Sequence, residues 1–230
     1  MKIYSLTCTR DEALSKTTTN LLEYFESCGI QTKTLINKNS IFEAYDKGLD
    51  EIDADLDDII IMCHDDIEIL TRPEVFTQVL KEKLSKSDTG FVGLAGAKNF
   101  GETAVWWNKQ EWMAGHLSGY VYHGTDNISM YPTYFGNLGD VVVLDGVFLA
   151  ATKRTLRSIQ LTQPKGFEGK WDFYDIFYTF QTFKKGLKNY TLPLQVRHES
   201  GGEITGRDSW HKNREAFISI FGKYLPASVS

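Results

Sequence analysis

The chain has 230 residues, of which 25 are Lys or Arg and 30 are Asp or Glu, so its formal net charge is −5. Hydrophobic residues at 42% and charged residues at 24% are typical of a globular protein with a sizeable core. The acidic balance argues against a dedicated nucleic-acid binder, and the lack of any apolar run of about 18 residues excludes a membrane-spanning helix. Because the first residues lack the apolar core of a secretory signal, we expect a cytoplasmic protein with reduced cysteines.

The first hundred residues alternate between strand and helix patterns. Strands are predicted at Ile3–Thr7, Thr32–Ile36, Ile59–Cys63 and Phe91–Ala95, and helices at Leu14–Cys28, Ser40–Leu49 and Pro73–Leu84. Gly29 is expected to end the first helix, and Ser40 with Glu43 to form a capping box at the start of the second. This alternation predicts an α/β fold with a mostly parallel central sheet flanked by helices, which binds ligands at the carboxyl ends of its strands.

The second half begins with residues 99–140, which lack long periodic segments and are predicted to be an excursion over the sheet. A strand at 141–144 continuing into 145–151, helices at 153–159 and 174–185, a strand at 192–197 and a helix at 210–224 are predicted to follow. The last helix is expected to bury Trp210, Phe217, Ile220 and Phe221. We predict one domain over 1–230, with a nucleotide-binding half at about 1–98 and an acceptor-binding half at about 99–230.

Three polar residues, His64, Asp65 and Asp66, end the most apolar of the predicted strands. Adjacent carboxylates at a ligand-binding edge repel each other unless a cation or a proton lies between them, and oxygen ligands suit Mg²⁺ or Mn²⁺. The motif therefore predicts a metal site. The alternative is that one aspartate only caps the following turn.

His198 follows another predicted strand, and the parallel layout can bring it beside Asp65 and Asp66. Imidazole suits Mn²⁺ better than Mg²⁺. The alternative for His198 is a hydrogen-bonded structural role.

Two further acids, Asp172 and Asp175, lie among Trp171, Phe173 and Tyr174 at the start of a predicted helix. A carboxylate at a helix N-terminus can be a cap. Among aromatic residues it can instead be partly desolvated, which raises its pKa and makes it a better general base.

The order of these segments resembles that of GT-A-fold glycosyltransferases of the family-2 type, in particular the bacterial glycosyltransferase-like branch with a His-Asp-Asp metal motif. The resemblance covers nearly the whole chain. It rests on segments 40–48, 59–68 (IIIMCHDDIE), 92–97 (VGLAGA), 144–150 (LDGVFLA), 173–175 (FYD) and 198–202 (HESGG). No single segment is specific, whereas six in this order are.

The resemblance implies a metal-dependent enzyme that moves a sugar from a nucleotide-diphosphate sugar to a hydroxyl acceptor with inversion. It implies Asp66 and His198 as ligands of Mn²⁺ or Mg²⁺, and Asp175, with Asp172 as the alternative, as the general base. The donor contacts that follow from it are Thr7, Thr9, Arg10, Asn37, Ser40, His64 and Asp65. Asn37 stands where many relatives have an aspartate, and Thr7-Cys8-Thr9-Arg10 replaces the family's Pro-Thr-Tyr-Asn, so the nucleotide stays open.

Aromatic residues make up 13% of the chain and gather after residue 100. Because Trp and Tyr rings stack on sugars, we expect Trp106, Trp107 and Tyr174, together with the implied Asp145 and Gly146, to contact the sugar or the acceptor. Packing beneath a loop is the alternative for each ring.

Two other functions are open to the sequence: a catalytically silent nucleotide- or carbohydrate-binding module, and a nucleotidyltransferase. The latter is expected to have a basic, Gly-rich phosphate loop, which Thr7–Arg10 is not. The expected partners are the donor and a glycan, lipid-linked or protein acceptor but no nucleic acid, and basic residues near the C-terminus leave a peripheral membrane contact open.

Overall fold

The chain was studied in a computed structural model, which describes residues 1–9, 13–36, 38–200 and 207–229. Within these residues the first half contains β1 (Ile3–Thr9), α1 (Lys16–Ser27), β2 (Gln31–Ile36), α2 (Ile41–Glu51), β3 (Ile59–Cys63), β4 (Ile67–Ile69), α3 (Pro73–Leu84) and β5 (Thr89–Gly93). The predicted alternation of strands and helices is confirmed. The short strand β4 was not predicted, because three residues are too few to show a period of two.

The second half contains more strands than the sequence predicted. Its elements are β6 (Ala95–Ala97), β7 (Asn99–Phe100), α4 (Lys109–Met113), β8 (Leu117–His123), β9 (Tyr131–Gly136), β10 (Asp140–Val141), β11 (Val143–Leu144), β12 (Phe148–Thr152), α5 (Lys153–Ser158), α6 (Tyr174–Lys184), β13 (Lys188–Thr191), β14 (Val196–His198), α7 (Asp208–Phe221), a 3₁₀ turn (Gly222–Tyr224) and β15 (Ala227–Ser228). The stretch 99–140 thus holds a β8–β9 hairpin rather than an irregular excursion.

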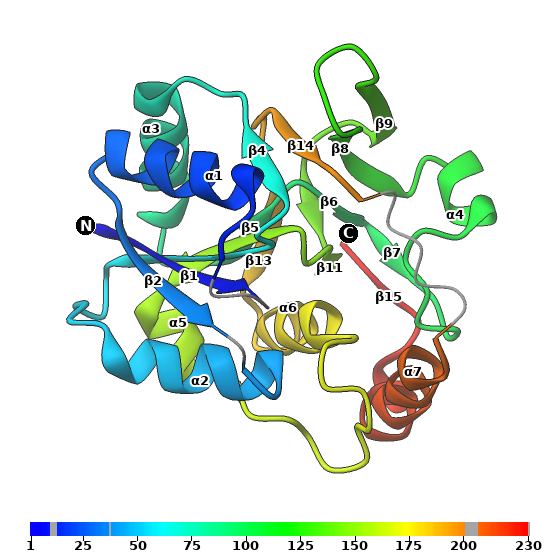
Figure 1. The fold of residues 1–230 in the computed structure, drawn as a ribbon. Coiled ribbons are helices and arrows are strands. Elements are labelled where there is room, and N and C mark those ends of the chain that lie inside the picture. Colours follow the sequence, from blue (N-terminus) through cyan, green and yellow to red (C-terminus); the bar gives the residue numbers. More distant parts are fainter. Residues whose placement is uncertain (10–12, 37, 201–206, 230) are drawn as a thin grey trace.

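Among the described residues, the main sheet has seven strands in the order β10-β13-β5-β12-β3-β1-β2. β1 pairs in parallel with β2 and β3, and β13 pairs in parallel with β5, while β12 runs antiparallel between β3 and β5. Figure 1 shows α1 and α3 on one face of this sheet and α2, α5 and α6 on the other. The prediction of a mostly parallel sheet flanked by helices is confirmed.

The second sheet, in the order β11-β6-β8-β14-β4 with β9 on β8, joins segments that are far apart in the sequence. The predicted strand Phe91–Ala95 is divided between β5 of the main sheet and β6 of this sheet. The predicted strand Leu192–Arg197 is wrong: β13 ends at Thr191 and β14 begins at Val196. A continuous apolar run does not reveal where a chain passes from one sheet to the other, since both sheets are buried there.

Close backbone packing in the second sheet depends on glycines, among them Gly96 and Gly119. A Cβ on Gly96 would lie 2.1 Å from the carbonyl oxygen of Val143, and one on Gly119, whose φ is +95°, would lie 1.9 Å from that of Leu94. Any side chain at either position would push the neighbouring backbone away.

Helix ends follow the predicted chemistry in part. Gly29 has φ +69° after α1, as expected for a residue that ends a helix, and Pro73 is the first residue of α3. The predicted capping box of α2 is wrong, because the Ser40 hydroxyl donates to the carbonyl of Lys170 (3.2 Å) and makes no cap bond. Ile220 of α7 is also misplaced by the prediction, since it is 40% exposed.

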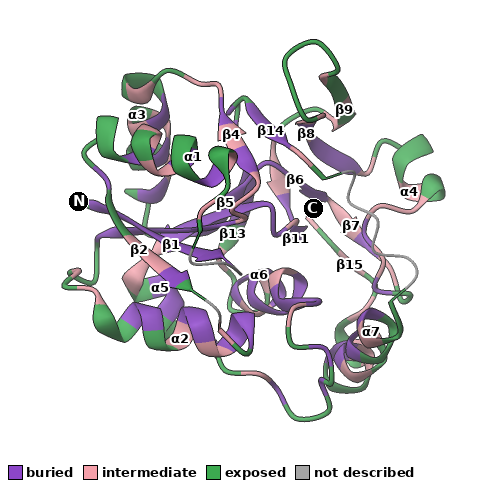
Figure 2. Cartoon of the chain, in the orientation of Figure 1, coloured by how far each residue is buried: buried purple, intermediate pink, exposed green. Residues whose placement is uncertain are grey.

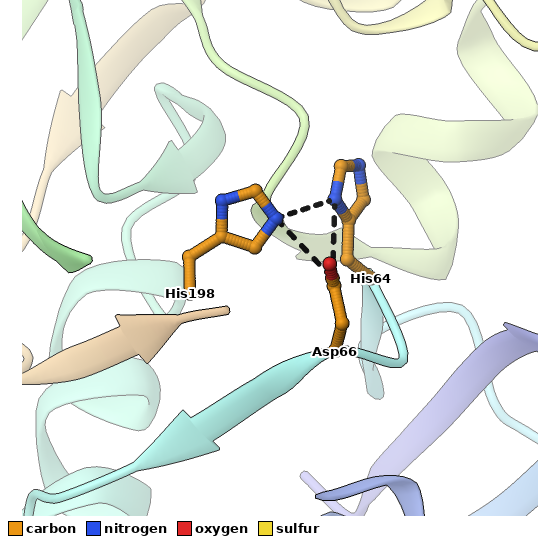
Figure 3. A group of neighbouring side chains, drawn as sticks. All are labelled: His64, Asp66 and His198. Carbon is orange, nitrogen blue, oxygen red and sulfur yellow. Dashed lines mark hydrogen bonds and ion pairs between the residues drawn. The ribbon is translucent and has the colours of Figure 1, made fainter. Parts of the chain in front are cut away.

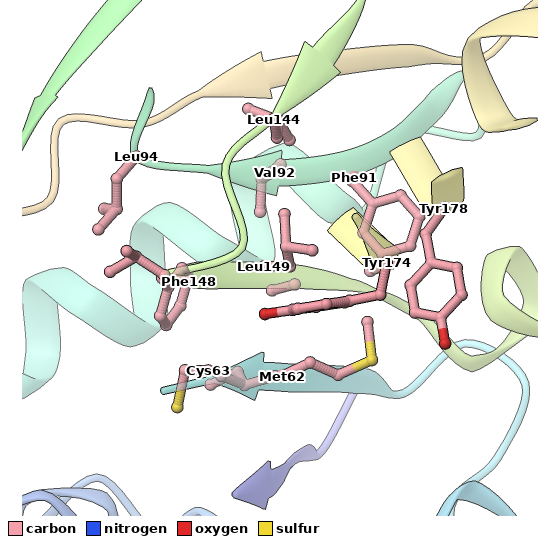
Figure 4. Packing of buried hydrophobic residues seen from close by; sticks show 14 of the residues in the cluster. Met62, Cys63, Phe91, Val92, Leu94, Leu144, Phe148, Leu149, Tyr174 and Tyr178 are labelled. Carbon is pink, nitrogen blue, oxygen red and sulfur yellow. The ribbon is translucent and has the colours of Figure 1, made fainter. Parts of the chain in front are cut away.

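The core lies between the main sheet and its helices, where most strands are buried, while the edge strand β2 is mostly exposed or half-buried (Figure 2). β3 is buried along its whole length, as its run of apolar residues predicted. Figure 4 shows the side chains of Met62, Leu149 and Tyr174 together in the buried cluster on the α6 side of this sheet. No helix among the described residues has both the length and the apolar character needed to cross a membrane.

Candidate active site

The loop that leaves β3 carries His64, Asp65 and Asp66, and β4 begins directly after it. β4 pairs antiparallel with β14 so that Ile67 lies opposite His198, and the N–H of Glu199 donates to the carbonyl of Asp66 (3.0 Å). This register, rather than the parallel sheet that the sequence suggested, brings His198 to the end of β3.

Three side chains converge there (Figure 3). Nε2 of His198 lies 3.2 Å from Oδ1 of Asp66 and 3.2 Å from Nδ1 of His64, and that Nδ1 lies 3.7 Å from the same carboxylate oxygen. All three ligand atoms lie within 4.8 Å of one another. His64 therefore belongs to the group, although the sequence assigned it to the donor.

The environment keeps the ligand atoms ready to bind a cation. The His198 side chain is only 4% exposed, whereas those of His64 and Asp66 are 38% and 35% exposed. Burial and the nearby His198 lower the pKa of His64, which favours a neutral imidazole with a free lone pair. Burial alone would raise the pKa of Asp66, but the hydrogen bond with His198 and the charges of both histidines hold that pKa below its usual range.

The donor set fits a divalent transition metal. Two imidazole nitrogens and one carboxylate oxygen are ligands that suit Mn²⁺ and its neighbours better than Mg²⁺, which prefers oxygen alone. Two neutral imidazoles whose nitrogen atoms lie 3.2 Å apart need a proton or a metal ion between them, because lone pairs repel.

The carboxylate of Asp175 lies near the group of His64, Asp66 and His198. The turn Asp145-Gly146-Val147 contacts both. The N–H of His64 donates to the carbonyl of Val147 (3.1 Å). One residue earlier in the turn, the N–H of Gly146 donates to Oδ2 of Asp175 (2.9 Å). The same turn thus contacts both the loop of the candidate metal-binding group and the carboxylate predicted to be the base.

Asp175 lies in the first turn of α6 and is partly buried. Desolvation and the charge of Asp145 raise its pKa to about 7, although backbone N–H groups of Ile176 and Gly146 oppose the shift. A carboxylate with this pKa changes its protonation state near neutral pH, which is the range that suits a general base. The part played by Asp145 was missed from the sequence, which placed this residue only along the sugar cleft.

Asp172 has a different environment from Asp175. It is 8% exposed, accepts a hydrogen bond from the Ser209 hydroxyl (2.6 Å) and is paired with Arg207 at 3.4 Å. Its backbone carbonyl accepts from Asn213 (2.8 Å). These contacts tie the segment before α6 to α7.

The predicted donor residues are spread along the end of the main sheet. The Thr7 hydroxyl is buried 3.9 Å from the Cys63 sulfur, Thr9 is buried at the end of β1, and Ser40 bonds to Lys170. Asp65 is half-buried, and its carbonyl accepts from the Thr18 hydroxyl (3.1 Å). Arg10 and Asn37 lie outside the described residues.

The predicted aromatic residues differ in exposure. Trp106 is 3% exposed and packs on Trp107 and Phe135, with ring centroids 5.6 and 5.3 Å away. A pocket of about 560 Å³ is lined by Trp107, Lys109, Trp112 and Met113. Tyr174 is buried, and its hydroxyl donates to the carbonyl of Gly146 (3.0 Å).

Known proteins are similar to this chain in sequence and in fold. The model of a family described as "Glycosyltransferase like family" matches residues 5–219. The streptomycin biosynthesis protein StrF of Streptomyces griseus is 24% identical over 211 residues, which cover 90% of this chain and 69% of that protein.

Solved structures show the same fold at low sequence identity. GalNAc-T7, solved with UDP, GalNAc and Mn²⁺, is similar with a TM-score of 0.60 and 10% identity over 97% of this chain and 49% of that one. A197 from STIV is similar with a TM-score of 0.52 and 14% identity over 87% of this chain and 86% of that one. The architecture described above is therefore a GT-A fold.

Proposed function

Since the chain belongs to the glycosyltransferase-like family and is a glycosyltransferase, we propose that it moves a sugar from a nucleotide-diphosphate sugar to a hydroxyl acceptor. The transfer depends on a divalent metal and inverts the anomeric carbon. This proposal rests on the position of His64, Asp66 and His198. Their ligand atoms lie within 4.8 Å of one another, beside the turn that contacts Asp175. A cytoplasmic location and a peripheral membrane contact stay predictions.

His64, Asp66 and His198 would hold the metal, and the GalNAc-T7 structure that contains Mn²⁺ supports Mn²⁺ as its identity. Two histidines and one carboxylate leave coordination positions for oxygen atoms of a bound diphosphate. When bound, the metal would act as a Lewis acid that stabilises the negative charge of the leaving diphosphate. Asp65, which lies in the same loop but outside the group, keeps its predicted contact with the donor.

Asp175 is proposed as the general base. Its carboxylate is fixed by Gly146 and has a pKa of about 7, so it can accept the proton of the acceptor hydroxyl as that oxygen attacks the sugar. Attack from the face opposite the leaving group inverts the anomeric carbon in one step. Asp172, the alternative base, is held by Ser209 and Arg207, which makes Asp175 the better candidate.

The acceptor is proposed to bind at the pocket of Trp107, Lys109, Trp112 and Met113. A series of ring contacts connects this pocket to the proposed base: the Trp107 ring lies 5.4 Å from that of Trp210 in a tilted arrangement, and the Trp210 ring lies 5.4 Å edge-to-face from that of Phe173, two residues before Asp175. Tryptophan faces suit the apolar faces of sugar rings. Trp106 supports this pocket from beneath, since it is itself buried.

A thermal-shift screen of UDP, GDP and dTDP, each with and without Mn²⁺, tests the proposal. We expect at least one nucleotide to raise the melting temperature only when Mn²⁺ is present. Asp66→Asn should abolish this effect, whereas Asp57→Asn should keep it, because Asp57 pairs on the surface with Arg154. A Mn²⁺-dependent shift that persists in Asp66→Asn would contradict the assignment.

A further inference from the structure

The turn Asp145-Gly146-Val147 and the start of α6 are joined by a closed set of hydrogen bonds. Gly146 uses both of its peptide groups: its N–H donates to Oδ2 of Asp175 (2.9 Å), and its carbonyl accepts from the hydroxyl of Tyr174 (3.0 Å). Two consecutive residues of α6 therefore bind the N–H and the carbonyl of one residue of the turn.

A third contact extends this connection along the helix. The N–H of Leu144 donates to the Thr179 hydroxyl (3.2 Å), which in turn donates to the carbonyl of Asp175 (2.7 Å). The backbone and the side chain of Asp175 are thus both tied to the segment 144–146.

The space around Gly146 is filled by the same residues. A Cβ added to Gly146 would lie 2.5 Å from the Tyr174 hydroxyl and 3.1 Å from Cβ of Asp175. A shorter contact than about 3 Å cannot be accommodated without displacing the tyrosine. The turn and the helix are therefore in contact with no room for a side chain.

The hydroxyl of Tyr174 stays protonated and can therefore donate a hydrogen bond at any pH at which the protein is folded. Tyr174 is 5% exposed, and burial together with Asp175 and Asp145 raises its pKa well above the usual value, so its hydroxyl keeps its proton. Figure 4 shows its ring between Leu149 and Met62, with the hydroxyl directed away from Tyr178. The ring has few alternative orientations in such packing.

The residue before it has an unusual backbone. Phe173, at the N-cap of α6, has φ 68°, in a region that costs a non-glycine residue about 1 kcal/mol or more. Its ring packs against Trp210 and Phe217, each 5.4 Å away, which holds this conformation. The sharp entry into α6 directs Tyr174 and Asp175 toward the turn.

We infer that Tyr174 is a positioning residue that fixes Asp175 through Gly146. The Tyr174 hydroxyl holds the carbonyl of Gly146 in place, and the N–H of the same residue holds one oxygen of the Asp175 carboxylate. Because a catalytic base needs one orientation toward its substrate, this contact sets the geometry of proton transfer. The inference deepens the proposed function and rests on Asp175 as the base.

Tyr174→Phe tests it, because it removes the hydroxyl and keeps the ring. Nuclear magnetic resonance of the protein without any donor follows two signals: amide hydrogen exchange at Gly146 and the pH titration of the Asp175 carboxyl carbon. We expect the N–H of Gly146 to exchange about tenfold faster, because the turn that holds it against Asp175 opens more easily once the Gly146 carbonyl loses the bond from Tyr174. The midpoint of the Asp175 titration should rise, because a weaker bond from Gly146 stabilises the ionised form less. Asp145, the charged neighbour of Asp175, is unchanged in the variant.

Two tyrosines of the same cluster are matched controls. The hydroxyl of Tyr45 is buried without a hydrogen-bond partner among the described residues, and its ring lies 5.9 Å from that of Tyr174. The hydroxyl of Tyr178 donates to the carbonyl of Leu161 (2.7 Å) and not to the turn, although its ring lies 6.0 Å from that of Tyr174. Neither Tyr45→Phe nor Tyr178→Phe should change the two signals.

Unchanged exchange at Gly146 and an unchanged Asp175 titration in a folded Tyr174→Phe protein would overturn the inference. Equal changes in the Tyr45→Phe protein would overturn it too, since they would show a general loosening. The proposed role of Asp175 as the base is tested by a separate experiment. Full transfer activity in Asp175→Asn would contradict that role.

Discussion

Nδ1 of His64 lies 3.2 Å from Nε2 of His198, although 134 positions separate the two residues in the chain. Their approach depends on the pairing of β4 with β14, which sets His198 opposite Ile67. The carboxylate of Asp66 completes the group. The protein thus gathers its proposed metal ligands from one loop and from one strand of the second sheet.

Removal of either loop ligand should weaken metal binding. We expect His64→Ala and Asp66→Asn each to lower the affinity for Mn²⁺ by at least about tenfold, measured by titration calorimetry. Asp65→Asn should bind Mn²⁺ normally, because Asp65 lies outside the group. His116→Ala is the matched histidine control, since His116 pairs with Glu111. Normal affinity in His64→Ala would restrict the site to the two ligands inferred from the sequence.

The rate of transfer should depend on the ionisation of Asp175. Because its pKa is raised to about 7, kcat should fall about tenfold per unit as the pH decreases below that value. Asp145→Asn removes one of the two causes of the shift, so the same fall should occur at a lower pH. The Asn side chain can still accept the hydrogen bond from Val147 that Asp145 accepts now. A profile that is identical in the two proteins would show that Asp145 does not act on the base.

Ionisation of Asp175, which favours transfer, should lower the stability of the fold. A carboxyl whose pKa is raised by folding destabilises the protein where it is ionised, above about pH 7, and contributes nothing below its unfolded pKa. Asp175→Asn should therefore raise the melting temperature at pH 8 by about 2–4 °C, equivalent to about 1 kcal/mol. The difference should shrink as the pH is lowered toward 4. An equal difference at both pH values would contradict the assigned pKa.

Asp172 should act on stability rather than on transfer. Asp172→Ala leaves the half-buried Ser209 hydroxyl and the exposed Arg207 without their acceptor, which should cost about 1 kcal/mol, or about 2–4 °C in melting temperature. Transfer at a temperature well below melting should be retained. Loss of transfer in a protein with normal melting would make Asp172 the base.

A substitution in the exposed wall of the aromatic pocket should weaken binding of the acceptor and leave binding of the nucleotide unchanged. Trp112 is 42% exposed, so Trp112→Ala should leave the melting temperature nearly unchanged. We expect it to raise the KM for a glycan acceptor about tenfold while Mn²⁺-dependent binding of the nucleotide stays the same, measured in a transfer assay and by calorimetry. Val75→Ala, at a similarly exposed apolar residue of α3, is the control.

Much of the fold could be predicted because local sequence patterns determine where its strands and helices begin and end. The apolar run Ile59–Cys63 is buried on both faces as β3, and Pro73 and Gly29 lie at the helix ends where their backbone preferences place them. These features depend on the residues themselves and on their immediate neighbours. The order of the motifs was enough to indicate the GT-A fold and the glycosyltransferase family.

Other features depended on residues far apart in the sequence. The antiparallel insertion of β12 between β3 and β5, and the division of one apolar run between β5 and β6, follow from pairing with distant strands. Ile220 was expected inside on its periodicity but lies at the edge of the face that α7 buries.

The sequence by itself determined which chemical groups the protein has: a His-Asp-Asp loop after a buried strand, a second histidine after another, and an acid at the start of a helix. Only the tertiary structure decided which of them act together. It places His64 in the proposed metal-binding group, ties Asp172 to Ser209 of α7, and brings Asp175 into contact with Gly146 beside Asp145 and Tyr174. The physical reason is that residue type and local spacing fix secondary structure and capping, whereas distances and pKa values depend on burial and on charges that long-range strand pairing brings into contact.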